Sequence, residues 1–146
     1  MGLLKAGAAQ LSVALSEEQL DQFETYFQEL ADWNQRANLT AIIEYEDVQV
    51  KHFLDSLTVY LTAREYLSGP VRVMDVGAGA GLPGLALKLA FPDMKLALVE
   101  SVKKKTAFLH HIVEKLGLED VSIYTGRAED LAREKDLRDA FDLVTV

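Results

Sequence analysis

The chain has 146 residues, about the size of one typical domain, and its 49% hydrophobic and 26% charged residues are ordinary for a protein with a packed core. The formal net charge is −8, so the chain as a whole does not attract nucleic acid or an anionic membrane, and such a partner would need a local basic patch. The absence of cysteine excludes a disulfide, a thiolate metal site and a cysteine nucleophile within these residues.

The first fifteen residues, MGLLKAGAAQLSVAL, are mildly apolar, and Lys5, Gln10 and Ser12 interrupt them. No apolar run approaches the roughly 18 residues that a membrane span needs. The charged start and unbroken apolar centre of a signal peptide are also missing. We therefore predict a cytoplasmic protein with no membrane partner.

Two amphipathic helices are predicted before residue 70. The first follows Ser16, which can form a capping box with Gln19, and its apolar residues recur at helical spacing: Leu20, Phe23, Phe27 and Leu30. The second is expected from about residue 46 to 67 and ends at SGP, with one apolar face made of Val50, Phe53, Leu54, Leu57 and Leu61. NLT, residues 38 to 40, predicts a turn between them.

The hydrophobic period changes after Pro70. Short aliphatic or β-branched runs predict strands at 71–76, 94–100, 121–125 and 141–146. The intervening segments predict helices at 84–91, 103–116 and 128–138. This alternation is typical of an α/β fold with a parallel sheet and right-handed crossovers, here at 70–146 after a helical segment at 1–69. Because an apolar strand at the end would leave a sheet edge exposed, we expect the chain to be C-terminally truncated.

VMDVGAGAGLPG, residues 73 to 84, follows the first predicted strand and carries four glycines within eight positions. Glycines at a strand-to-helix turn allow positive φ and let a ligand approach the backbone closely, and the helix starting near Pro83 would aim its free N–H groups at that ligand. Open α/β sheets bind ligands outside the carboxyl ends of their strands, where this loop is expected. The loop therefore predicts a small-molecule site rather than a tight turn without a ligand.

Two ligands fit this loop. Its last three glycines match the G-x-G-x-x-G dinucleotide pattern, and Glu100 stands about 20 residues further on, as that pattern requires. Asp75 and Gly77 lie upstream, and a carboxylate beside the turn would repel the pyrophosphate of NAD but favour the ammonium and sulfonium charges of S-adenosylmethionine. With either ligand, Glu100 is expected to accept hydrogen bonds from the ribose hydroxyls.

The chain also resembles a known family. The resemblance rests on five blocks in this order: WNQRANLT, HFLDSL, DVGAGAGLPG, LVESVKKKTAFL and GRAED. These blocks resemble the bacterial small-subunit ribosomal RNA guanine-N7 methyltransferases, also called the glucose-inhibited division protein B family. The resemblance implies an S-adenosylmethionine-dependent enzyme, with N-terminal helices on a partial Rossmann-like methyltransferase domain at 70–146. The implied substrate is a guanine in the decoding-region loop of 16S ribosomal RNA, in the small ribosomal subunit or its precursor.

The resemblance implies a set of cofactor-contacting residues. Gly77 and Leu82 belong to the glycine loop, and Ala128 with Glu129 occupies the position near the adenine. The full implied set is Asp75, Gly77, Ala78, Gly79, Gly81, Leu82, Glu100, Ser101, Ala128 and Glu129. Ala78 departs from the family, which often has Ser or Thr there. A family arginine motif that follows the fourth strand lies beyond Val146.

The implied chemistry needs no general base. Guanine N7 carries an in-plane lone pair and loses no proton when it is methylated, so the transfer depends on the alignment of nitrogen, methyl and sulfur. We therefore assign no catalytic residue.

Lys103, Lys104 and Lys105 stand at the start of a predicted helix, where cations are unfavourable toward the helix dipole. They predict contact with RNA phosphates, and a solvated helix face is the alternative. His52 and Asp55 lie three apart in the second helix but have no third ligand at an obvious spacing, so no metal site is predicted. As part of a family block, they are expected to brace the N-terminal helices against the glycine loop.

Two other functions stay open at this point. An NAD-dependent oxidoreductase of the Rossmann type would use the same glycine loop. A non-catalytic cofactor-binding fragment would keep the loop without turnover.

Overall fold

The computed structural model describes all residues from 1 to 146. Its helices are α1 (Gly2–Gln10), α2 (Glu17–Ala37), α3 (Tyr45–Asp47), the π-helix η1 (Val48–Leu54), α4 (Asp55–Leu57), α5 (Val59–Leu67), α6 (Gly84–Ala90), α7 (Lys103–Lys115) and α8 (Ala128–Leu131). Its strands are β1 (Arg72–Val76), β2 (Lys95–Glu100), β3 (Val121–Thr125) and β4 (Leu143–Thr145). None of the helices combines the length and apolar character needed to cross a bilayer.

The strands form one parallel sheet in the order β3-β2-β1-β4. Val73 of β1 pairs with Leu96 of β2 on one side and with Leu143 of β4 on the other. The chain therefore moves outward from β1 through β2 to β3 and then returns to the far side of β1. Such a reversal of strand order is the place where open α/β sheets form a ligand crevice. The predicted α/β fold with a parallel sheet is confirmed.

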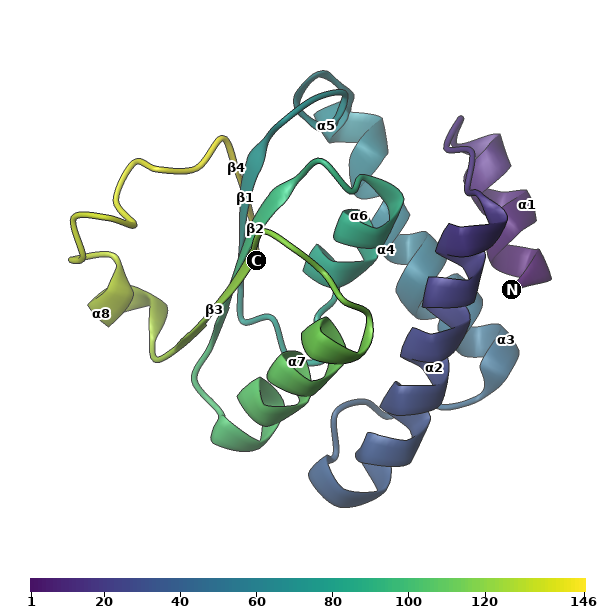
Figure 1. Cartoon of the computed structure of the whole chain (residues 1–146), viewed down its shortest axis with the longest axis horizontal. Coiled ribbons are helices and arrows are strands. Elements are labelled where there is room, and N and C mark those ends of the chain that lie inside the picture. Colours follow the sequence, from purple (N-terminus) through teal and green to yellow (C-terminus); the bar gives the residue numbers. More distant parts are fainter.

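The layers are visible in Figure 1, where α6 and α7 lie on one side of the sheet, the N-terminal helices lie beyond them, and the segment containing α8 lies on the other side. Every residue of α6 is buried. Apolar side chains from both predicted segments, such as Phe23 of α2 and Phe108 of α7, join one hydrophobic core. The boundary expected after residue 69 stays a prediction about domain organisation, but the core crosses it.

Helix α2 begins as its sequence predicts. The Gln19 N–H donates to Ser16 Oγ at 3.1 Å, and the Ser16 N–H donates to Gln19 Oε1 at 2.8 Å, which completes the capping box. The amide of Gln19 also donates to the Leu89 carbonyl at 2.9 Å, so the cap attaches α2 to the end of α6. After α2, Asn38 adopts a left-handed conformation with φ of 47°, and the predicted turn is confirmed.

The second predicted helix is helical but not continuous. It is π-helical over η1, and its φ/ψ angles depart from helical values at Ala63. Phe53 and Leu57 are buried, whereas Val50 and Leu61 are 44% and 55% exposed. The predicted apolar face was therefore wrong at these two exposed positions, because the i→i+5 turns of a π-helix and the break after it change the angular spacing that a regular α-helix would have.

The helix predicted at 128–138 was wrong beyond Leu131, where α8 ends and turns follow. Residues 132–139 are rich in charge and mostly exposed, with Leu137 the one buried side chain among them. Good helix formers without an apolar stripe do not hold a short helix in water, because packing supplies most helix stability in proteins.

Candidate functional site

A cavity of about 320 Å³ lies at the carboxyl ends of β1, β2 and β3. Its lining residues come from the end of each strand and from the segment that follows it: Val76, Gly77, Val99, Glu100, Ser101, Gly126, Arg127, Ala128 and Glu129. This is the edge where parallel sheets bind their ligands. The fold therefore brings together three chain segments, and more than twenty residues separate each segment from the next in the sequence.

The glycine loop after β1 is tied to the end of β2. The backbone N–H groups of Gly77 and Ala78 both donate to the Val99 carbonyl, at 2.9 and 3.0 Å. Gly77 has a φ of 71°, and a Cβ added there would meet no atom within 4 Å. Only glycine adopts this conformation without strain, and the open space allows a ligand to approach the backbone.

Glu100 lies at the end of β2 and is 6% exposed. Its Oε1 accepts from the Gly79 N–H at 3.0 Å, and its Oε2 accepts from the Val102 N–H at 2.8 Å. A carboxylate has about four lone-pair sites, so each oxygen keeps one for a ligand in the cavity that Glu100 lines. The side chain both holds the glycine loop and presents acceptors to a ligand.

Asp75 makes two hydrogen bonds within the protein. It is 1% exposed and does not line the cavity. Its Oδ2 accepts from the Gly84 N–H at 2.9 Å, and its Oδ1 accepts from Thr145 Oγ1 at 3.0 Å. The two hydrogen bonds hold the start of α6 against β4, and the predicted attraction between this carboxylate and a cationic ligand stays a prediction.

The burial of Asp75 raises its pKa, although the hydrogen bonds from Gly84 and Thr145 oppose that shift. Between the ordinary and the raised pKa, the folded protein binds more protons than the unfolded chain, so the unfolding free energy falls as pH rises through that window. We expect Asp75→Asn to remove this decline, since an amide can accept from Gly84 and donate to Thr145 without titrating.

Urea unfolding of the wild type and Asp75→Asn between about pH 4 and pH 7 measures this difference. The exposed Asp136→Asn variant is the control and should follow the wild type. Parallel stability profiles for the wild type and Asp75→Asn would show that the buried carboxyl is not the group responsible.

The remaining predicted cofactor residues divide into two sets. Ser101, Ala128 and Glu129 line the cavity, as Gly77 and Glu100 do. The other predicted loop residues do not line it, and their contact with the cofactor stays a prediction: Ala78, Gly79, Gly81 and Leu82. Four further lining residues were not predicted: Val76, Val99, Gly126 and Arg127. The signal for Gly126 and Arg127 was present in the GRAED block, whose glycine directly follows β3 as Gly77 directly follows β1.

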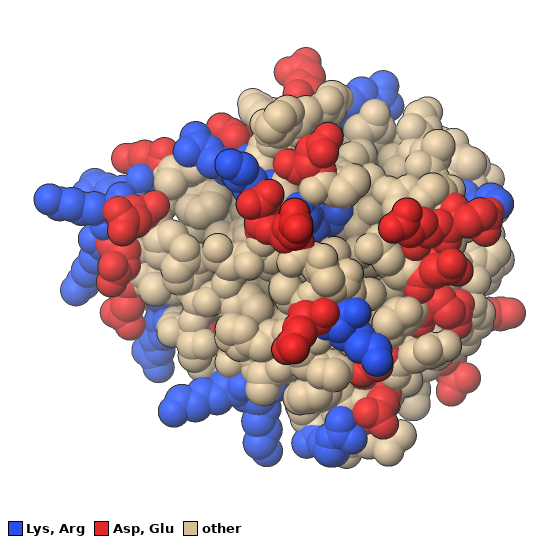
Figure 2. Space-filling model, viewed as in Figure 1, with Lys and Arg blue, Asp and Glu red and all other residues tan.

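The three predicted basic residues form the first turn of α7, close after Glu100. Lys103 and Lys104 are exposed and Lys105 is half-buried, and none of the three takes part in an ion pair. In Figure 2, Lys and Arg side chains gather along the lower edge, over the start of α7 and the end of α2. A local basic surface therefore adjoins the cavity of an acidic protein.

His52 and Asp55 do not contact the glycine loop through a hydrogen bond. His52 Nε2 lies 2.7 Å from Thr40 Oγ1, and burial lowers the pKa of the imidazole. The contact between His52 and Thr40 links the turn after α2 to η1. No three His, Asp or Glu side chains are grouped closely enough to hold a metal ion.

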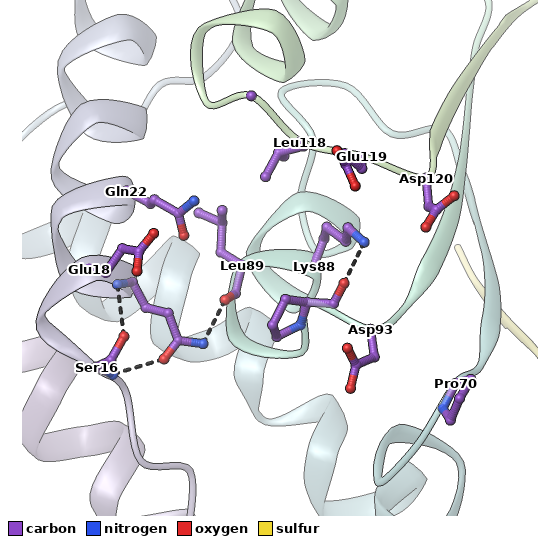
Figure 3. A pocket seen from close by; sticks show the side chains of 13 residues that line it. Ser16, Glu18, Gln22, Pro70, Lys88, Leu89, Asp93, Leu118, Glu119 and Asp120 are labelled. Atoms are coloured by element: carbon purple, nitrogen blue, oxygen red, sulfur yellow. Dashed lines mark hydrogen bonds between the residues drawn. The ribbon is translucent and has the colours of Figure 1, made fainter.

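A larger cavity, of about 670 Å³, lies at the opposite edge of the sheet (Figure 3). It is lined by residues just before β1, β2 and β3, such as Pro70, Asp93 and Asp120. Lys88 within it donates to the carbonyls of Pro92 and Met94. We assign the candidate ligand site to the smaller cavity, because ligands of open α/β sheets bind at the carboxyl edge and the glycine loop lies there.

The sequence profile of the family described as rRNA small subunit methyltransferase G matches residues 19–146. The chain belongs to this family. Ribosomal RNA small subunit methyltransferase G of Dehalococcoides mccartyi is 50% identical over 145 residues, covering 99% of this chain and 60% of that protein. The methyltransferase G of Oceanobacillus iheyensis is 45% identical over 133 residues, covering 91% of this chain and 55% of that protein. The chain thus spans little more than half the length of these relatives.

Solved structures support the Rossmann-like methyltransferase fold of this methyltransferase G family member. A putative O-methyltransferase from Klebsiella pneumoniae has a TM-score of 0.61 at 18% identity, covering 83% of this chain and 52% of that chain. An SAH-bound methyltransferase from Podospora anserina has a TM-score of 0.56 at 21% identity, covering 89% of this chain and 49% of that chain. The predicted family and fold are confirmed. Family membership does not favour the NAD-dependent oxidoreductase.

Proposed function

We propose that the protein binds S-adenosylmethionine in the carboxyl-edge cavity and methylates N7 of a guanine in 16S ribosomal RNA. The observation that carries this proposal is the family match over residues 19–146, which includes every residue lining that cavity. The ribosomal substrate, in the free RNA or in the small subunit, also makes a cytoplasmic location part of the proposal.

The residues of the cavity fit this cofactor. The open backbone at Gly77 suits close approach of the methionine part, and the free acceptor sites of Glu100 suit the two ribose hydroxyls. Ala128 and Glu129, from the start of α8, line the remaining side and would hold the adenine. When bound, the cofactor supplies a methyl group on a positively charged sulfur.

The protein has no proton to move in this reaction. Because guanine N7 already carries its lone pair, the side chains around the cavity need to bind, orient and exclude water. The target guanine would have to leave its stack to reach a cavity beside the glycine loop. The assignment of no general base therefore agrees with the proposed chemistry.

The lysines at the start of α7 would contact RNA phosphates. Their ammonium groups are free of ion pairs. The lysines follow closely after Glu100 and Ser101, which line the cavity. Phosphate contacts position an RNA without reading its sequence, so these lysines would raise affinity and leave the choice of base to the pocket.

We expect Lys103→Ala combined with Lys104→Ala to weaken RNA binding and to flatten its dependence on salt by a slope of about 1 to 2, because each phosphate contact releases bound counterions. Fluorescence anisotropy with a 16S RNA stem-loop over a series of salt concentrations measures both effects. Lys5→Ala combined with Lys95→Ala removes the same charge elsewhere on the molecule and is the control. An equal loss in both double variants would assign the effect to net charge alone.

Transfer of a labelled methyl group to small-subunit RNA tests the proposed function. We expect label in 16S RNA, and mass spectrometry of the digested nucleosides should identify it as 7-methylguanosine. Label in another nucleoside would overturn the guanine-N7 assignment. Binding of NAD in place of S-adenosylmethionine would support the oxidoreductase instead.

A further inference from the structure

Helix α2 contacts the glycine loop through one buried tyrosine. Tyr26 has no exposed surface, and its ring packs against Phe53 at 5.1 Å and Phe108 at 6.4 Å between ring centroids. Its hydroxyl donates to the Ala80 carbonyl at 2.5 Å across 54 positions of the chain. The contact joins the N-terminal helices to the segment between β1 and α6.

The Ala80 carbonyl depends on this hydroxyl. Ala80 is 7% exposed, and no backbone N–H donates to its carbonyl. A buried carbonyl without a donor is costly, so the Tyr26 hydroxyl fixes the position of this peptide group. The next residue, Gly81, has a φ of 94°, and a Cβ there would lie 2.7 Å from Tyr26 Oη. The loop therefore lies directly against the hydroxyl.

The rest of the loop is linked to this fixed point. The Gly81 N–H donates to the Ala78 carbonyl at 2.7 Å, and the next glycine back, Gly79, donates to Glu100. A loop with glycines at positive φ is flexible by itself, because glycine loses more conformational freedom on folding than any other residue. An outside contact that orders such a loop before a ligand arrives lowers the entropy cost of binding.

We propose that Tyr26 is a positioning residue for the cofactor: its hydroxyl holds Ala80 and Gly81, and thereby keeps the glycine loop in the conformation that S-adenosylmethionine binds. This inference rests on the proposed function. Tyr26 itself does not line the cavity. It makes cofactor affinity depend on the docking of α2, so the N-terminal helices take part in cofactor binding.

Tyr26→Phe tests the inference, because it removes the hydroxyl and keeps the ring in its aromatic surroundings. We expect the Kd for S-adenosylhomocysteine, measured by calorimetry, to rise about fivefold or more, and amide hydrogen exchange of the Gly79 and Gly81 N–H groups to accelerate in the absence of ligand. Near-ultraviolet circular dichroism checks that the aromatic core is retained.

Tyr45→Phe is the matched control. It removes a hydroxyl whose hydrogen bond to Glu24 Oε2 is also 2.5 Å long and which lies on α3. Its Kd and loop exchange should match the wild type. An unchanged Kd and unchanged loop exchange in Tyr26→Phe, or equal changes in both variants, would overturn the role of Tyr26. Binding of S-adenosylhomocysteine to the wild type would still support the proposed function in that case. Absence of binding in the wild type would overturn both proposals at the first titration.

Discussion

Replacing Glu100 with alanine should weaken S-adenosylmethionine binding at least about tenfold. The change removes acceptors for the ribose hydroxyls, and hydrogen bonds to a charged group contribute about 1.5 to 3 kcal/mol each. It also leaves the N–H groups of Gly79 and Val102 without their acceptors, so the glycine loop loses its attachment to the end of β2. Both effects reduce affinity.

Isothermal titration calorimetry with S-adenosylmethionine measures this loss. Glu100→Gln keeps one acceptor oxygen for Gly79 and should fall between the wild type and the alanine variant. Glu114→Ala removes an exposed carboxylate from α7 and should bind as the wild type does. An unchanged Kd in Glu100→Ala would place the cofactor away from the end of β2.

The substitution Gly81→Ala should lower the unfolding free energy by about 2 to 5 kcal/mol, combining the strain of a positive φ with overpacking in a full site. The added Cβ would lie 2.5 Å from Leu85 Cδ1 and 2.7 Å from Tyr26 Oη, and φ at this position is 94°. Neither neighbour can withdraw easily, since both are fully buried.

Gly117→Ala separates the two causes. Gly117 has a φ of 61°, but a Cβ there meets nothing within 4 Å, so only the backbone strain of about 1 to 2 kcal/mol applies. Urea unfolding of both variants gives the comparison. Equal losses in the two would show that packing of the loop against α2 and α6 contributes nothing beyond backbone strain.

The sequence predicted the sheet well because each buried strand is a short apolar run between turn residues, and the ranges of β1 and β2 differ from the prediction by only their first residue. Helix α1 was not predicted, since it has no side-chain N-cap. Gln49 of η1 replaces that cap, as its Oε1 accepts from the N–H groups of Leu3 and Leu4 at 3.1 and 3.2 Å. A partner 45 residues away leaves no local signal.

The candidate site was predictable only where its residues carry a local sequence signal. Gly77 and Glu100 carry signals of their own, a glycine turn and an acidic residue at a strand end, and both line the cavity. The burial of Asp75 depends on Thr145 and Gly84, and the role of Tyr26 depends on Ala80, so these contacts appear only once the chain is folded. Residue type alone does not show that the Asp75 side chain accepts hydrogen bonds from two other segments of the chain.

The most direct test of a cofactor site at the glycine loop is to titrate S-adenosylhomocysteine into ¹⁵N-labelled protein. The amide signals at both edges of the sheet are then followed by nuclear magnetic resonance. We expect the largest shifts at the carboxyl edge, at Gly77, Glu100 and Ala128, with Gly117 and Asp120 at the opposite cavity unchanged. Shifts confined to Gly117 and Asp120, or no shifts at a saturating concentration, would contradict a cofactor site at the glycine loop.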